Sequence, residues 1–181
     1  MTNMDLVALF GSRERMRILE HVMLREDLRV TTTARDLGLS KGLVSGYMGL
    51  LQESGLVKKT SEGGYSPTDS PTARHVKKLL NVVRIETGRL DTRGIRGIGI
   101  YGSWAEGANT VESDADIWLR VKEYPSQEYL AALSAQLRKM LGCEIRLLVL
   151  TPSKTKEVTK DSVFFSNLRR HSIRLWGEDI D

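Results

Sequence analysis

The chain has 181 residues, of which 40% are hydrophobic and 28% charged, and its formal net charge is +4 at pH 7. This length holds one ordinary domain or two small ones, and the composition is typical of globular proteins with a hydrophobic core. No apolar run approaches the roughly 20 residues of a membrane span, and no signal-peptide core opens the chain, so we expect no membrane partner. The single cysteine excludes an intrachain disulfide and favours a cytoplasmic setting.

The charge is unevenly distributed along the chain. Residues 1–90 contain 14 Lys and Arg against 10 Asp and Glu, whereas residues 91–181 contain 13 of each. The whole basic excess therefore lies in the first half, which favours an anionic partner there. An excess of this size is mild, so charge alone does not decide the partner.

The first half of the chain predicts helices and one short hairpin. Apolar spacing and capping residues place helices at about 13–25, 31–37 and 41–53, and a further helix that opens at Pro71. Two short runs, 56–59 and 65–66, flank the turn residues Gly63 and Gly64 and predict a hairpin.

A helix, a tight turn at Gly38, a second helix and a hairpin follow one another over residues 10–88. In this order, and with the run 32–40, these elements resemble a winged helix-turn-helix domain. The resemblance implies double-stranded DNA as a partner, with the helix after Ser40 entering the major groove. The residues expected to meet DNA phosphates are Ser40, Lys41, Ser45, Lys58 and Lys59.

The outward face of that third helix departs from the DNA-reading pattern. Gly42, Gly46 and Gly49 stand where side chains that recognise bases would be expected. An alternative therefore stays open, in which the winged helix serves protein contact or homodimerisation.

The second half alternates strands and helices. Strands are predicted at 97–101, 115–121, 143–150 and 172–176, and helices from about 103 and at 126–141, 154–159 and 162–170. We expect two domains, a winged helix over 1–90 and an α/β domain over 97–181 with a mixed sheet flanked by helices. The expected linker is the segment 91–96, within the stretch 88–97 that has arginines among glycines and no apolar period.

Two short motifs in this half suggest phosphate chemistry. Gly102-Ser103 ends an apolar run where a helix can begin, and the free N–H groups of a helix start favour phosphate. Asp114 and Asp116 stand at i and i+2 around the start of the next strand, so both carboxylates are expected on one face. A phosphate cradle beside paired carboxylates is what magnesium-assisted nucleotidyl transfer requires.

At this spacing the two motifs resemble the minimal nucleotidyltransferases of the DNA polymerase β superfamily, over about residues 95–178. The resemblance implies a nucleoside triphosphate as substrate or ligand, with its phosphates held by Gly102 and Ser103. It also implies Mg²⁺ or Mn²⁺ bound by Asp114 and Asp116. Such domains transfer a nucleoside monophosphate to a macromolecular acceptor, and they often act as antitoxins paired with a helical toxin.

The family pattern also needs a third carboxylate on the strand at 143–150, and two readings of that strand stay open. Arg146 falls at the acidic position, and Glu144 lies two residues earlier on the same face. If Glu144 substitutes, we expect an active transferase with Asp114, Asp116 and Glu144 as catalytic residues. If Arg146 stands beside the metal site, it repels metal ions or binds a nucleotide phosphate. The chain is then a DNA-binding regulator with a nucleotide-sensing, catalytically impaired domain.

Overall fold

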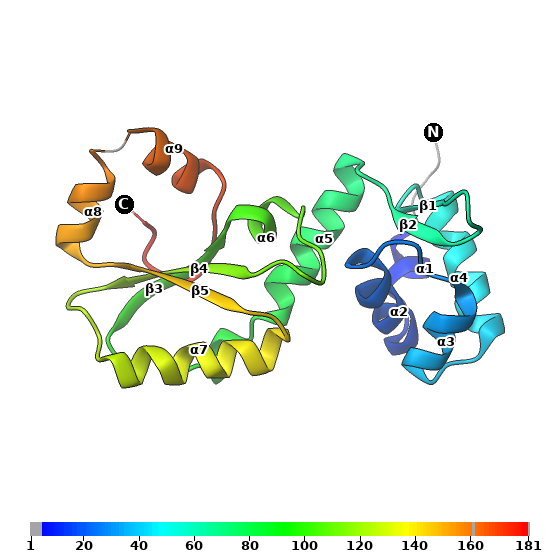
Figure 1. Ribbon diagram of the computed structural model, residues 1–181, viewed down its shortest axis with the longest axis horizontal. Coiled ribbons are helices and arrows are strands. Elements are labelled where there is room, and N and C mark those ends of the chain that lie inside the picture. The colour runs from blue at the N-terminus through cyan, green and yellow to red at the C-terminus, as the bar shows by residue number, and fades with distance from the viewer. Residues whose placement is uncertain (1–4, 161, 181) are drawn as a thin grey trace. The chain divides into compact units, whose positions relative to one another are not determined.

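The computed structural model describes residues 5–160 and 162–180 (Figure 1). Residues 1–4, 161 and 181 of the two predicted domains lie outside the described residues. The chain divides into two compact units, Met1–Lys77 (unit 1) and Lys78–Asp181 (unit 2). Within the described residues, no helix is both long and apolar enough to cross a membrane.

Before α5 (Pro71–Arg84), the described residues of unit 1 form four helices and a two-stranded antiparallel hairpin. The elements are α1 (Leu6–Phe10), α2 (Arg13–Met23), α3 (Val30–Leu37), α4 (Lys41–Glu53), β1 (Val57–Lys59) and β2 (Tyr65–Pro67). Gly38 ends α3 at a φ of 64°, a left-handed conformation that favours glycine, and the Ser40 hydroxyl accepts a hydrogen bond from the backbone N–H of Leu43 to cap α4. The helix α1 is the element that the sequence did not predict.

Buried aliphatic side chains hold unit 1 together. Ile18 and Val22 of α2 and Val44 and Met48 of α4 are fully buried. The Tyr47 hydroxyl donates a hydrogen bond of 2.7 Å to the carbonyl of Leu9, which attaches α1 to α4. The apolar stripes expected for these helices therefore face a common core.

The helix α5 (Pro71–Arg84) runs through the division between the units. Unit 2 continues with η1 (Thr87–Arg89), β3 (Ile95–Tyr101), α6 (Gly102–Glu106), β4 (Ala115–Val121), α7 (Gln127–Leu141), β5 (Ile145–Leu150), α8 (Pro152–Val158), α9 (Ser162–Arg170) and β6 (Ile173–Gly177). The division precedes the expected linker 91–96, and Ile95 of that segment is buried and begins β3.

The four strands of unit 2 form a mixed sheet in the order β5-β4-β3-β6. β4 and β5 are parallel, and the other two pairs are antiparallel. Helices flank this sheet, with α7 on one side and α8 and α9 on the other (Figure 1). The expected mixed sheet flanked by helices is confirmed.

Alternation along β4 gives the sheet two different faces. Ile117 and Leu119 belong to the larger core, which includes the apolar side of α7. Trp118 points to the opposite face and packs with Leu150 and Leu168. Gly99 of β3 lies opposite Trp118, and a Cβ there would come within 2.4 Å of the indole ring. The bare backbone of β3 thus makes room for this tryptophan.

Candidate active site

Three side chains form a row across the sheet on the same face as Trp118. The strand register pairs Tyr101 of β3 with Asp116 of β4, and Asp116 with Arg146 of β5. Paired residues on neighbouring strands point to the same side of a sheet. Burial, reinforced by Asp116, raises the pKa of Tyr101, whereas Arg146 lowers it.

The two aspartates and Arg146 form one charged cluster. The Arg146 guanidinium lies 2.5 Å from a carboxylate oxygen of Asp114, two residues before Asp116. Burial raises the pKa of Asp116, Arg146 lowers it, and the neighbouring carboxylate of Asp114 raises it. The cluster therefore carries a half-buried carboxylate for which a further cation would be favourable.

Gly102 lies directly against this cluster. It begins α6 at a φ of 62°, and a Cβ on it would meet a carboxylate oxygen of Asp116 at 2.8 Å. The fold thus brings the Gly102-Ser103 backbone and the Asp114/Asp116 pair together. The expected helix start is real but short, since α6 spans only five residues.

Glu144 is not brought into the row. It precedes β5, and its carboxylate accepts a hydrogen bond of 2.7 Å from Arg138 of α7, with 66% of the side chain exposed. Glu144 and Asp114 border a common surface hollow, but the described residues contain no cluster of three or more His, Cys, Asp or Glu that could hold a metal ion. Of the two readings of this strand, the structure places Arg146 beside the aspartates.

A buried amide pair, which the sequence did not predict, joins α5 to the loop before Asp114. Asn81 of α5 donates to the carbonyl of Trp104 and to the side chain of Asn109, each at 2.8 Å, and both asparagines are buried. Asn109 belongs to the loop that leads to Asp114, and its polar neighbours gave no sign of burial. Trp104 is 2% exposed and lies in the core.

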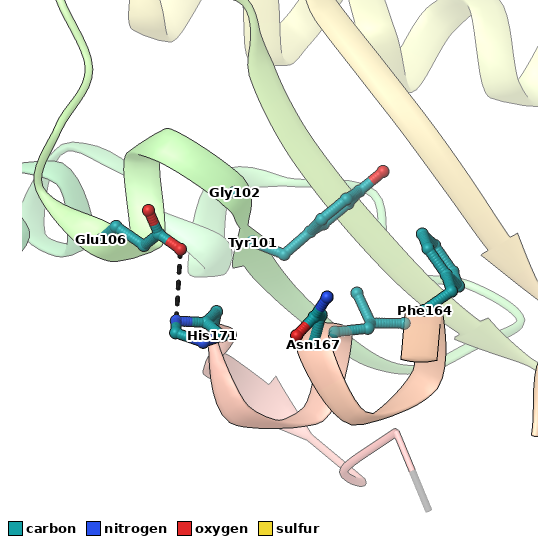
Figure 2. A pocket seen from close by; sticks show the side chains of 7 residues that line it. Tyr101, Gly102, Glu106, Phe164, Asn167 and His171 are labelled. Carbon is teal, nitrogen blue, oxygen red and sulfur yellow. Dashed lines mark ion pairs between the residues drawn. The ribbon is translucent and has the colours of Figure 1, made fainter. Parts of the chain in front are cut away.

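A hollow of about 300 Å³ opens beside Gly102, between α6 and α9 (Figure 2). Its lining combines the aromatic rings of Tyr101 and Phe164 with the amide of Asn167. At its rim, Glu106 and His171 form an ion pair of 3.2 Å. The hollow adjoins the charged cluster because two of its lining residues are neighbours of Asp116: Tyr101 pairs with Asp116 across the strands, and Gly102 lies against its carboxylate.

The five residues predicted to contact DNA lie in unit 1. Ser40 and Lys41 are at the start of α4, Ser45 is one turn further, and Lys58 and Lys59 are on β1. All five are exposed, and the Lys59 ammonium lies 6.0 Å from the centre of the Tyr65 ring.

Comparison with known proteins identifies unit 2. The model of the family described as nucleotidyltransferase domain matches residues 82–170. MJ1379 of Methanocaldococcus jannaschii, to which protein adenylyltransferase activity is ascribed, is 31% identical over 80 residues, 41% of this chain and 80% of that protein. The chain belongs to the nucleotidyltransferase domain family.

Two solved structures also resemble the chain, at lower sequence identity than MJ1379. One is a toxin-antitoxin with AMP-PNP, 20% identical, which aligns with 56% of this chain and 73% of that chain at a TM-score of 0.39. The other is a tri-AMPylated Shewanella oneidensis HEPN toxin in complex with MNT antitoxin, 15% identical, with coverages of 58% and 73% and a TM-score of 0.36.

Proposed function

We propose that unit 2 transfers a nucleoside monophosphate from a nucleoside triphosphate to a hydroxyl group of an acceptor protein. The observation that carries the proposal is the contact of Gly102 with the Asp114/Asp116 pair, within the segment that matches the nucleotidyltransferase family. The activity ascribed to MJ1379 supports a protein as acceptor and ATP as donor.

In this reaction the acceptor oxygen bonds to the α-phosphorus, and the bond from that phosphorus to the β-phosphate oxygen breaks. Pyrophosphate leaves, and the hydroxyl proton passes to solvent. The backbone at Gly102 and Ser103 binds phosphate oxygens, because the N–H groups at the start of α6 are free to donate. A residue with a Cβ at position 102 would push against Asp116. The aromatic hollow beside Gly102 offers room for the nucleoside.

The donor set fits a magnesium or manganese ion. Asp114 and Asp116 would hold it, since carboxylate oxygens suit hard cations and Mg²⁺ in such sites is bound by one or two carboxylates together with substrate phosphates. A bound ion would neutralise the charge that develops on the leaving pyrophosphate. The half-buried carboxylate of Asp116, with its raised pKa, supports a cation there.

We expect Asp116→Asn to lower pyrophosphate release from ATP by roughly 100-fold, equivalent to about 2.7 kcal/mol in the barrier. The substitution keeps the shape of the side chain and removes its charge. Steady-state pyrophosphate release in magnesium, with a heat-treated lysate as the source of acceptor hydroxyl groups, measures the effect. Glu123→Gln, an exposed acid just beyond the other end of β4, should leave the rate unchanged. Equal rates for Asp116→Asn and the unaltered protein would contradict the proposed site.

A second candidate function is favoured by the contact between Arg146 and Asp114. In this candidate, unit 2 binds a nucleotide without turning it over and regulates DNA binding by unit 1. Calorimetric binding of ATP together with the pyrophosphate measurement separates the two functions. Tight binding with no pyrophosphate release supports the sensor, and release supports the transferase.

For unit 1 we propose a winged helix that binds double-stranded DNA, within the predicted domain of residues 1–90. The helix α4, the hairpin β1–β2 and the exposure of Ser40, Lys41, Ser45, Lys58 and Lys59 support this proposal. The exposed glycines of α4 have open space around them and offer few side chains for reading bases. We therefore expect binding that depends on phosphates more than on sequence.

Removing two wing lysines should change how DNA binding depends on salt. Each phosphate contact contributes about 0.9 to the slope of log affinity against log salt. We expect Lys58→Ala/Lys59→Ala to reduce that slope by about 2 in fluorescence anisotropy titrations with a random duplex. A double change on α5, Lys77→Ala/Lys78→Ala, is the control that removes equal charge elsewhere. If both pairs change the slope equally, the wing has no special role.

A further inference from the structure

The charged cluster of Asp114, Asp116 and Arg146 contains a cationic side chain, that of Arg146. Arg146 occupies the position beside Asp116 on the neighbouring strand, and its guanidinium contacts Asp114 at 2.5 Å. The two carboxylates and the guanidinium together leave one net negative charge. Glu144, the nearest further carboxylate on this strand, is paired with Arg138 instead.

We propose that Arg146 binds the triphosphate directly and that the site therefore works with one divalent cation per nucleotide. The inference rests on the proposed function of unit 2. Affinity for divalent cations depends on the number of charged ligands, and a guanidinium against one of two carboxylates opposes a second divalent ion. Arg146 then supplies, beside the phosphates, positive charge that a second divalent ion would otherwise supply.

The ion pair between Arg146 and Asp114 is exposed, which leaves Arg146 free to contact a bound triphosphate. The side chain of Arg146 is 70% exposed and that of Asp114 is 29% exposed. Pairs so open to solvent contribute little to stability, so Arg146 can turn from Asp114 to an incoming phosphate at small cost. Its planar donors match two phosphate oxygens at once, which gives a geometry that a lysine would not.

The number of bound ions tests the proposal without any turnover. Native mass spectrometry is carried out on the full chain with Mn²⁺ and α,β-methylene-ATP, in which the bond broken by transfer is blocked. We expect one Mn²⁺ per protein–nucleotide complex in the unaltered protein and two in Arg146→Asp, which turns the charged cluster of Asp114, Asp116 and Arg146 into three carboxylates. Lys139→Asp makes the same charge change at an exposed position of α7, outside the charged cluster, and should keep one. Two ions in the unaltered protein, or one in Arg146→Asp, would overturn the inference.

A second measurement uses a milder variant. In EDTA, we expect the unaltered protein to retain affinity for α,β-methylene-ATP and Arg146→Ala to lose at least tenfold of it. Equal affinities for the two proteins without metal would overturn the role of Arg146. If the unaltered protein binds no nucleotide with or without metal, the proposed function itself fails, and this outcome differs from all of the others.

Discussion

Replacing Gly102 with alanine is expected to weaken nucleotide binding by roughly tenfold to a hundredfold, or about 1.4 to 2.8 kcal/mol. The added Cβ meets the Asp116 carboxylate at 2.8 Å, and the φ of 62° disfavours any residue with a Cβ by about 1–2 kcal/mol. Either the start of α6 shifts away from the phosphates or Asp116 shifts away from the cation. Both movements separate groups that the reaction needs in contact.

Gly94→Ala provides the matched control. Gly94 has a φ of 77°, and a Cβ on it would meet nothing within 4 Å. The variant therefore has the same backbone strain without the collision, and calorimetry should find its affinity for α,β-methylene-ATP close to that of the unaltered protein. Equal affinities for Gly102→Ala and Gly94→Ala would show that the approach of Gly102 to Asp116 has no part in binding.

Removing the Trp118 side chain is expected to destabilise unit 2 by about 3–5 kcal/mol. Trp118 is fully buried, and the bare backbone of Gly99 leaves no side chain to fill the cavity that Trp118→Ala creates. Urea unfolding followed by far-ultraviolet circular dichroism measures the loss, because the free energy of unfolding falls linearly with denaturant.

Trp176→Ala is the control for that experiment. Trp176 lies on β6 of the same sheet, but it is 44% exposed. We expect a clearly smaller loss of stability than for Trp118→Ala. Similar losses of stability in the two variants would contradict the burial of Trp118 against Leu150 and Leu168.

The sequence predicted most elements of unit 2 because each signal was local. Alternation placed β4 at residues 115–121, and the helix predicted at 126–141 agrees with α7. The same alternation places Asp116 and Trp118 on one face. What local signals did not predict depends on contacts between distant segments. The burial of Asn109 requires Asn81, 28 residues earlier, and the exposure of Trp176 depends on what covers the edge strand β6.

The residue of β5 that lies beside Asp116 shows most clearly what local signals could not predict. Counting along the strand placed both Glu144 and Arg146 on the face of the aspartates. Only the parallel register of β4 and β5, which sets Arg146 opposite Asp116, and the attraction of Glu144 to Arg138 on α7 separate them. Register and side-chain pairing are tertiary properties, so the sequence left both readings open.

Whether unit 2 transfers a nucleoside monophosphate can be tested by following the position of a radioactive phosphate. The protein is incubated in magnesium with a heat-treated lysate, whose own kinases are inactive, as the source of acceptors and with ATP labelled at either the α- or the γ-phosphate. We predict that label from α-labelled ATP becomes attached to protein, that label from γ-labelled ATP does not, and that Asp116→Asn abolishes the first signal. Attachment of the γ-label alone, or of neither label while ATP is bound, would contradict the account.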